Sequence, residues 1–302
     1  MTTSTKLVEC VPNFSEGRDP KKMEQLVDCF RGKPGVKLLD YCNDVDHNRM
    51  VVTAVGSPEA LKIVVVEAIG KAIELINLNE HTGAHPRVGA ADVVPFIPVQ
   101  NCSMDEAIQL ANEVAACAAE RFNLPVYLYE KAASRPHRSN LADVRKGQFE
   151  GLTEKMTSPL WIPDYGPATP HPTAGASIVG ARNYLIAWNV NLQTNNLDIA
   201  KHIAKTIRFS SGGFPCVKAL GLSLPEQGIV QVSMNLTDFT QTGMFEVFER
   251  IQKEAKLLGV EIACSELIGM LPMGAVADLA ANYLNIKEFS SERILECSIL
   301  NS

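Results

Sequence analysis

The sequence lacks any hydrophobic run of membrane-spanning length. Its most apolar stretches, such as residues 63–66, are interrupted by charged residues within a turn or two. A helix needs about 20 consecutive apolar residues to cross a bilayer. The first six residues are also too polar and too few for the hydrophobic region of a signal peptide. These absences predict a cytoplasmic protein with no membrane partner.

Paired cysteines and an excess of basic residues are also missing. The eight cysteines are scattered without a CxxC pair, which favours reduced thiols over a disulfide framework or a zinc site. Cys42 is interpreted as a packing residue, with a reactive thiol as the alternative. The formal net charge of −6 and the pI near 5.6 oppose binding to nucleic acid, which requires a broad basic surface. A local cationic pocket stays compatible with this charge.

The composition is that of a folded protein. The chain has 302 residues, of which 46% are hydrophobic and 21% charged, enough for one large core or two moderate ones. Apolar periodicity predicts strands and helices in both halves. In the first half we expect strands at 7–11, 36–41, 50–55, 93–99 and 125–129, and helices at 20–31, 57–76 and 103–122. Residues 131–175 contain too many prolines for a long helix and predict a loop-rich region.

The second half repeats this pattern. We expect strands at 184–192, 217–222, 229–236 and 260–264, and helices at 197–207 and 244–258. Both halves therefore follow the order strand, helix, strand, strand, helix, strand. The predicted fold class is α/β (α+β), with two ferredoxin-like βαββαβ sandwich subdomains at 1–180 and 181–302. Because each such sheet leaves one face without helices, we expect a ligand groove between the halves.

The most concentrated polar chemistry lies at residues 79–92, between a predicted helix and a predicted strand. The segment holds His81 and His85, and its glycines and proline predict a shaped turn. The spacing of the two histidines would align metal ligands only on a helix, so we expect no metal. A general acid/base role fits an imidazole near neutrality, and a hydrogen-bonded loop histidine is the plain alternative.

Three further features are candidates for binding. Arg49 and Arg87 could each hold a carboxylate of a dicarboxylic substrate, although a surface or sheet-end arginine is the preferred interpretation of either one taken singly. A rigid segment rich in glycine and proline lacks the spacing and the lysine of a phosphate loop, and is either a flat-ligand site or a stiff linker. Its residues are Gly166, Pro167, Ala168, Thr169, Pro170, His171, Pro172, Thr173, Ala174 and Gly175.

Several of these segments together resemble the formiminotransferase family. The resemblance rests on residues 8–17 (VECVPNFSEG), 81–98 (HTGAHPRVGAADVVPFIP), 125–129 (PVYLY) and 180–182 (GAR), and later on 189–192 and 231–233. It covers nearly the whole chain. The opening decapeptide and the His-Pro-Arg segment are long enough to be specific.

The resemblance implies an activity and a site. The family transfers a formimidoyl group between N-formimidoyl-L-glutamate and tetrahydrofolate in histidine degradation and one-carbon metabolism, with tetrahydrofolate as co-substrate. It implies that His85, the histidine before Pro-Arg, is the catalytic acid/base, that residues 166–175 line the folate site, and that folate lies between two α/β subdomains. It also implies a homodimer, and a separate cyclodeaminase acting downstream, because the chain ends after one transferase-length unit.

Two alternatives stay open at this point. The donor could be 5-formyltetrahydrofolate, since formyl and formimidoyl groups differ only in =O against =NH. The chain could instead be a folate-binding protein without turnover, because Ala84 stands where many relatives carry a glutamate and the second domain of the vertebrate enzyme is missing. Cys42 stands where mammalian relatives carry an aspartate, and this departure bears with Ala84 on the identity of the donor and the acceptor.

Overall fold

The computed structural model describes residues 6–300, which divide after Arg182 into two compact units. The elements of unit 1 are β1 (Leu7–Cys10), β2 (Asn13–Phe14), α1 (Pro20–Asp28), β3 (Val36–Asp44), β4 (Arg49–Gly56), α2 (Pro58–Leu75), β5 (Ala91–Gln100), α3 (Met104–Phe122), β6 (Val126–Glu130), η1 (Pro136–Arg138), α4 (Leu141–Arg145), α5 (Leu152–Met156), η2 (Pro159–Trp161) and β7 (Ser177–Ala181).

Unit 1 contains the predicted βαββαβ arrangement and an extension of it. β1 pairs antiparallel with β4 and β5, and β3 pairs antiparallel with β4, so the strand order β5-β1-β4-β3 of a ferredoxin-like sheet is confirmed. β7 then pairs parallel with β5, and β6 pairs parallel with β7. The sequence predicted the strand at β6 but no element at β7, which follows the loop-rich region. The described residues of unit 1 form a seven-stranded sheet.

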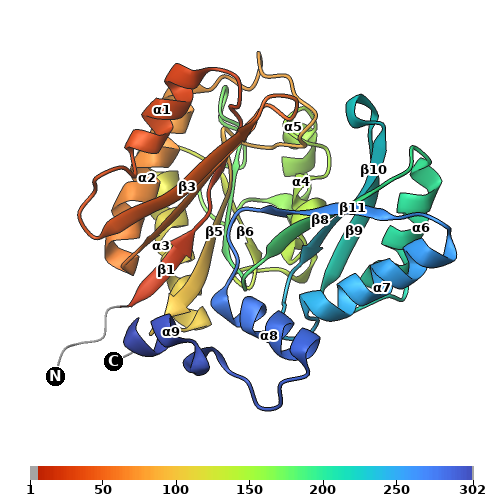
Figure 1. The fold of residues 1–302 in the computed structure, drawn as a ribbon. Coiled ribbons are helices and arrows are strands. Elements are labelled where there is room, and N and C mark those ends of the chain that lie inside the picture. The colour runs from red at the N-terminus through yellow and green to blue at the C-terminus, as the bar shows by residue number, and fades with distance from the viewer. Residues whose placement is uncertain (1–5, 301–302) are drawn as a thin grey trace. The chain divides into compact units, whose positions relative to one another are not determined.

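The helices of unit 1 begin where their capping residues predict. Ser57 accepts a hydrogen bond from the backbone N–H of Ala60, and Pro58 occupies the first helical position of α2. Ser103 and Glu106 form the predicted capping box of α3. α2 and α3 lie on one face of the sheet, as Figure 1 shows, and their apolar side chains join the main core.

The extension is buried on both faces, because its side chains alternate between two hydrophobic clusters. On β6, Val126 and Leu128 join the main core, whereas Tyr127 and Tyr129 join a second cluster on the opposite face. The short helices α4 and α5 cover that second cluster with Val144, Leu152 and Met156. The loop-rich region of the sequence is therefore an ordered layer over the sheet.

Unit 2 is a second ferredoxin-like sandwich. Its elements are β8 (Ile186–Leu192), α6 (Leu197–Ile207), η3 (Phe209–Ser211), β9 (Val217–Leu224), η4 (Pro225–Gln227), β10 (Ile229–Leu236), α7 (Met244–Leu257), β11 (Ile262–Ile268), α8 (Met273–Leu284), η5 (Ser291–Arg293) and α9 (Leu295–Leu300). The four strands are antiparallel in the order β11-β8-β10-β9, which confirms the predicted topology. The core lies between this sheet and its helices. α8 and α9 were not predicted from the sequence.

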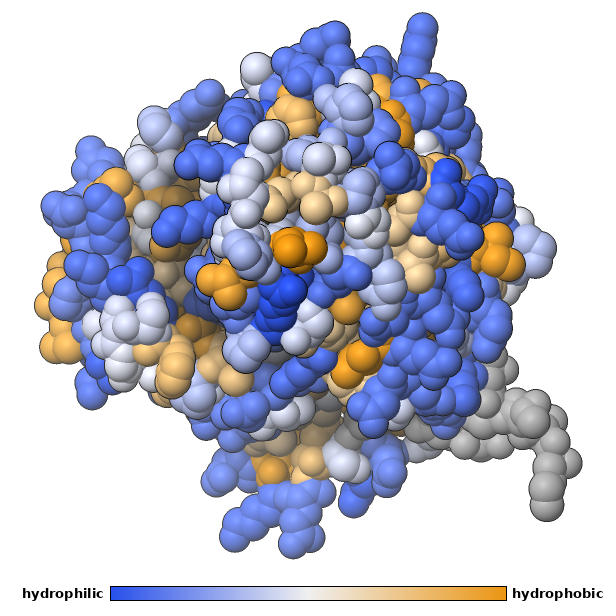
Figure 2. Space-filling model, turned by 180° about the vertical axis from the view of Figure 1, so that it is seen from behind, coloured by the Kyte–Doolittle hydropathy of each residue, from blue (hydrophilic) through white to orange (hydrophobic). Residues whose placement is uncertain are grey.

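Among residues 6–300, no helix has both the length and the apolar character needed to span a membrane. The face drawn in Figure 2 is mostly hydrophilic, with hydrophobic residues in small groups among charged and polar ones.

Candidate active site

The histidine-bearing segment lies between α2 and β5 and is a fixed turn, as predicted. Ala84 donates its backbone N–H to the carbonyl oxygen of Asp46 at 3.1 Å. A Cβ on Gly83 would stand 2.4 Å from the carbonyl oxygen of His47, and a Cβ on Gly89 would stand 2.1 Å from that of Ala176. Only glycine permits these two close backbone approaches. The turn therefore holds its imidazoles in defined positions.

His85 is nearly buried, with 8% of its surface exposed, and faces a buried carboxylate. Its Nε2 atom has no hydrogen-bond partner and lies 3.8 Å from Oδ2 of Asp92, which is too long for a hydrogen bond. Burial lowers the pKa of His85 below its ordinary value, and the charges of Arg145 and Arg49 add to the effect, while Asp92 opposes it. The ring is therefore neutral near pH 7 and able to accept a proton.

Asp92 is the fixed centre of this site. It is 1% exposed, and its Oδ1 accepts hydrogen bonds from the backbone N–H groups of Val88 (2.7 Å) and Gly89 (3.3 Å). Its Oδ2 accepts from Nε of Arg145 at 3.0 Å and forms an ion pair with Nη2 of the same residue. Burial opposes ionisation of Asp92, but these partners outweigh it and hold its pKa below the ordinary value. The carboxylate next to His85 is therefore charged and immobile.

Two guanidinium groups act on the same imidazole. Arg145, at the end of α4, belongs to the layer over the second face of the sheet, and Arg49 is the first residue of β4. Burial lowers the pKa of Arg49, and the like charge of Arg145 lowers it further. Nε of Arg49 is buried without a hydrogen-bond partner. A buried guanidinium nitrogen without a partner marks a place where an anion would be bound favourably.

Sequence reasoning missed Arg145. Nothing in its local sequence distinguishes it from a surface arginine, and α4 has only five residues. Its partner Asp92 lies 53 positions earlier in the chain. The only feature of the sequence that could have indicated a role for Arg145 was its position in the long loop-rich region 131–175, because long ordered loops are more often functional than accidental.

His81 has a structural role at the start of the turn. Its Nε2 bonds to the carbonyl oxygen of Asn48 at 2.9 Å, and Nε of Arg87 donates to its Nδ1 at 3.2 Å. These contacts fix the neutral tautomer with the proton on Nε2, and burial lowers its pKa. Both ring nitrogens are thus occupied. No group of three or more potential metal ligands occurs within residues 6–300.

Arg87 is occupied by a protein carboxylate. Its Nη1 and Nη2 donate to the two oxygens of Glu150 at 2.9 and 2.7 Å, and Nη2 also donates to the carbonyl oxygen of His81 at 3.2 Å. This bidentate ion pair connects the histidine turn to the segment that contains α4 and α5. Arg87 therefore supports the turn in this structure, whereas Arg49 has a nitrogen available for an anion.

The Gly166–Gly175 segment meets the histidine turn at one end. Leu78 donates its N–H to the carbonyl oxygen of Thr173 at 2.7 Å, and Ala90 donates to that of Ala174 at 3.0 Å. Gly175 has φ +69°, and a Cβ there would lie 2.1 Å from the carbonyl oxygen of Val88. The other end packs against Leu124, whose carbonyl oxygen would be 2.3 Å from a Cβ on Gly166. Between these ends, residues 167–170 are partly or fully exposed.

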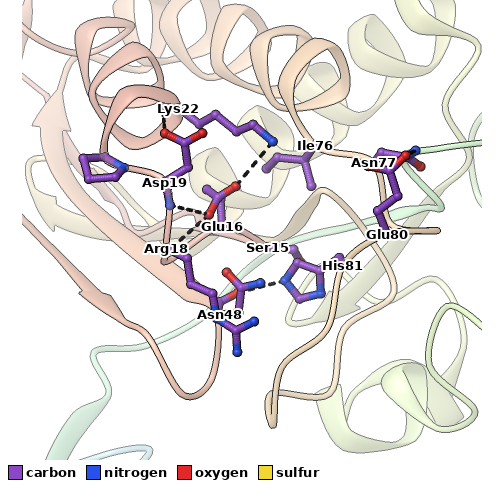
Figure 3. A pocket seen from close by; sticks show the side chains of 11 residues that line it. Ser15, Glu16, Arg18, Asp19, Lys22, Asn48, Ile76, Asn77, Glu80 and His81 are labelled. Atoms are coloured by element: carbon purple, nitrogen blue, oxygen red, sulfur yellow. Dashed lines mark hydrogen bonds and ion pairs between the residues drawn. The ribbon is translucent and has the colours of Figure 1, made fainter.

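A polar cavity of about 480 Å³ opens beside the turn (Figure 3). It is lined by Ser15, Glu16, Arg18, Asp19, Pro20, Lys22, Asn48, Ile76, Asn77, Glu80 and His81. His85 is not in the lining, so this cavity adjoins the candidate site without containing its central imidazole. Glu16 is held there by the N–H groups of Arg18 and Asp19, at 2.9 and 3.0 Å. The sequence analysis had not singled out Glu16, Arg18 or Lys22.

The fold and the site describe a two-unit α/β protein in which a neutral histidine lies beside a buried carboxylate and two guanidinium groups. Residues 7–182 match the family model "Formiminotransferase domain, N-terminal subdomain", and residues 187–297 match "Formiminotransferase domain". The chain belongs to the formiminotransferase family.

Named relatives cover the chain almost completely. The chain is 45% identical to "Glutamate formimidoyltransferase" of Streptococcus pyogenes, over 98% of this chain and 99% of that protein. It is 43% identical to the protein of the same name from Thermoplasma acidophilum, over 96% of each chain. "Formimidoyltransferase-cyclodeaminase" of Rattus norvegicus is 40% identical over 92% of this chain, which corresponds to 52% of that protein.

Proposed function

We propose that the protein is a glutamate formimidoyltransferase, which moves a formimidoyl group between N-formimidoyl-L-glutamate and tetrahydrofolate. Family membership supports a folate-dependent one-carbon transferase, and the two relatives named for this activity align over nearly their full length. The observation that carries the chemistry is the placement of His85, whose Nε2 lies 3.8 Å from the charged, immobile Asp92.

His85 moves the protons in this proposal. From N-formimidoyl-L-glutamate to tetrahydrofolate, folate N5 attacks the formimidoyl carbon, and the bond from that carbon to the glutamate nitrogen then breaks. His85 takes the proton from N5 and gives it to the departing nitrogen. The carboxylate of Asp92 beside Nε2 favours the tautomer protonated there, which leaves Nδ1 to exchange the proton.

The carboxylates of the glutamate substrate need cationic partners near His85. Arg49 supports this role best, because its buried Nε has no partner and its charge acts on His85. Arg145 contributes to the same positive field while it holds Asp92. Arg87, the other candidate from the sequence, is already bound by Glu150, so we assign it to the support of the turn.

Residues 166–175 are the proposed contact for folate. Their ends are fixed by close backbone packing at Gly166 and Gly175, and the residues between are exposed enough to touch a ligand. Such a segment would lose little conformational entropy when it binds a flat molecule. Its bonds to the histidine turn would place that ligand near the reacting groups.

The test is an assay of purified protein with N-formimidoyl-L-glutamate and tetrahydrofolate, following released glutamate. We expect turnover, and a loss of about 10²- to 10⁴-fold in kcat for His85→Ala, the usual contribution of a positioned acid/base. His202→Ala is the matched control, because this histidine on α6 is exposed and belongs to unit 2. Circular dichroism and binding of 5-formyltetrahydrofolate check that the variants fold.

Three other results of these assays would change the proposed function. Turnover in His85→Ala equal to that of the unaltered protein would remove the acid/base role. Folate binding without release of glutamate would reduce the protein to a folate-binding protein. A parallel assay with 5-formyltetrahydrofolate and glutamate measures formyl transfer, and a strong preference for that donor would change the named reaction.

A further inference from the structure

A second imidazole lies beside His85. His47 belongs to the turn between β3 and β4, and its ring meets the ring of His85 edge to face, with 6.4 Å between the ring centroids. The side chain of His47 is 48% exposed, whereas that of His85 is 10% exposed. Two positions after His47 stands Arg49, the proposed contact for the carboxylates of glutamate. The turn therefore brings a solvent-accessible imidazole to the region where that substrate is expected.

A carboxylate orients the ring of His47. Oδ1 of Asp44 accepts a hydrogen bond from the backbone N–H of His47 at 2.9 Å, and its Oδ2 lies 2.8 Å from Nδ1 of the ring. Burial raises the pKa of Asp44, but its hydrogen bonds with His47 outweigh this effect and hold the pKa below the ordinary value. The charged carboxylate keeps a proton on Nδ1 and leaves Nε2 as the nitrogen that can exchange one.

Backbone contacts fix the place of this turn. Oδ1 of Asn48 accepts a hydrogen bond from the N–H of Gly17, and its side-chain amide donates to the carbonyl oxygen of Thr82, both at 2.9 Å. The N–H of Ala84 donates to the carbonyl oxygen of Asp46 at 3.1 Å. The last two bonds join the turn directly to the segment that carries His85. The two imidazoles are therefore held next to each other by the backbones that carry them.

The proposed reaction contains a proton transfer that His85 does not perform. His85 moves one proton between folate N5 and the glutamate nitrogen, which then leaves as a neutral amine. Free glutamate carries an ammonium near pH 7, because aliphatic amines are protonated there. In the opposite direction this ammonium has no lone pair, and it cannot attack until a base removes one proton. His85 must itself stay neutral to take the next proton from the same nitrogen after the attack.

We propose that His47 is a second acid/base, which takes the proton of the glutamate ammonium when glutamate is the nucleophile. The inference rests on the proposed function. Nε2 of His47 accepts one proton, and the electrons of that N–H bond become the lone pair that attacks the formimidoyl carbon. The exposed imidazolium then releases its proton to water. When glutamate is the leaving group, the same steps run backwards and protonate the freed amine. Asp44 acts as a positioning residue for this ring.

The experiment follows the transfer from 5-formimidoyltetrahydrofolate to L-glutamate and, in parallel, to 3-fluoro-L-glutamate. Fluorine withdraws electrons, so more of the second acceptor is already a neutral amine. His47→Gln should lose about 10²-fold in kcat/KM for glutamate at pH 7, and less than about 10-fold for the fluorinated acceptor. For this variant, kcat/KM for glutamate should also rise about 10-fold per pH unit between pH 7 and 9, as the free amine forms. The unaltered protein should show no such rise.

Two variants serve for comparison. His202→Gln is the matched control, because this histidine is exposed on α6, and it should behave like the unaltered protein. Asp44→Asn should show the same pattern as His47→Gln with a smaller loss, because the imidazole remains but is no longer oriented. Circular dichroism checks that each variant folds.

Three outcomes would overturn the assignment. Unchanged kcat/KM for glutamate in His47→Gln would remove any role for this ring. Equal losses for the two acceptors would show that His47 only supports the turn. Parallel pH profiles for the variant and the unaltered protein would show that the proton of the ammonium goes to another group. Failure of the unaltered protein to form N-formimidoyl-L-glutamate would instead refute the proposed function itself.

Discussion

The two units share one strand order and differ in what lies on the second face of the sheet. In unit 1, β7 and β6 extend the sheet, and α4 and α5 cover its second face with apolar side chains. In unit 2 the corresponding face carries Asn189, Asn191, Gln231 and Ser233. The same strand order therefore supports different chemistry. The side chains on the sheet face opposite the helices can differ, while the apolar core between the sheet and the helices maintains the fold.

The charges of the two regions differ in the same way. In unit 1 one buried carboxylate faces an imidazole and two guanidinium groups, a balance that favours an incoming anion. In unit 2 the carboxylate of Glu266 is held by the uncharged amides of Asn191 and Gln231. This contrast can be tested by changes in unit 1 that alter charge or packing at single positions.

The largest effect is expected from Arg145→Met. The change leaves Asp92 buried with its charge only partly compensated, and we expect a loss of about 3–5 kcal/mol in the free energy of unfolding. Urea denaturation measures it. Adding Asp92→Asn should restore part of the loss, because the buried charge is then gone. If the double variant were as unstable as the sum of the single changes, the ion pair would not be what couples α4 to the turn.

Gly175→Ala should have the next largest effect. Its Cβ would stand 2.1 Å from the carbonyl oxygen of Val88, at a φ of +69°, and the clash and backbone strain together should cost about 3 kcal/mol. Gly32→Ala is the matched control, because its φ of +67° is the same and no atom lies within 4 Å of the added carbon. That variant should lose about 1 kcal/mol. Equal losses in the two variants would contradict the tight tether between residues 173–176 and the histidine turn.

A smaller effect, on pH dependence, is expected from Arg49→Met. Burial is the main cause of the low pKa of His85, and Arg49 lowers it further, so removing that charge should raise this pKa toward its ordinary value. Because the neutral ring is the active base, the acid limb of kcat/KM should move to higher pH. The KM for N-formimidoyl-L-glutamate should also rise about 10-fold, the equivalent of one hydrogen-bonded charge.

Arg49→Lys separates these two effects. Lysine keeps the positive charge but lacks the planar fork, so the acid limb should stay in place while the KM still rises. A limb that moved equally in both variants would show that the charge of Arg49 does not set the pKa of His85. Steady-state rates across pH 5–9 with a fixed folate concentration give both quantities.

Much of the fold could be predicted from sequence, and less of the site. The caps at Ser57 and Ser103, the alternating strand of unit 2 and the non-helical turn around His85 all follow from neighbours within a few positions. β7 was not predicted, because the prolines before it conceal a short strand that exists only by pairing with β5 and β6. Arg87 had the features expected of a substrate ligand, and only the structure pairs it with Glu150.

The sequence by itself determined the order of elements, the two βαββαβ patterns and the rigid turn that carries the histidines, because periodicity, capping and glycine act locally. The tertiary structure decided which groups act on those histidines. Arg145 lies 53 positions from Asp92, Glu150 63 from Arg87, and Glu266 75 from Asn191. Contacts at such separations depend on sheet pairing and layer packing, which local sequence does not encode.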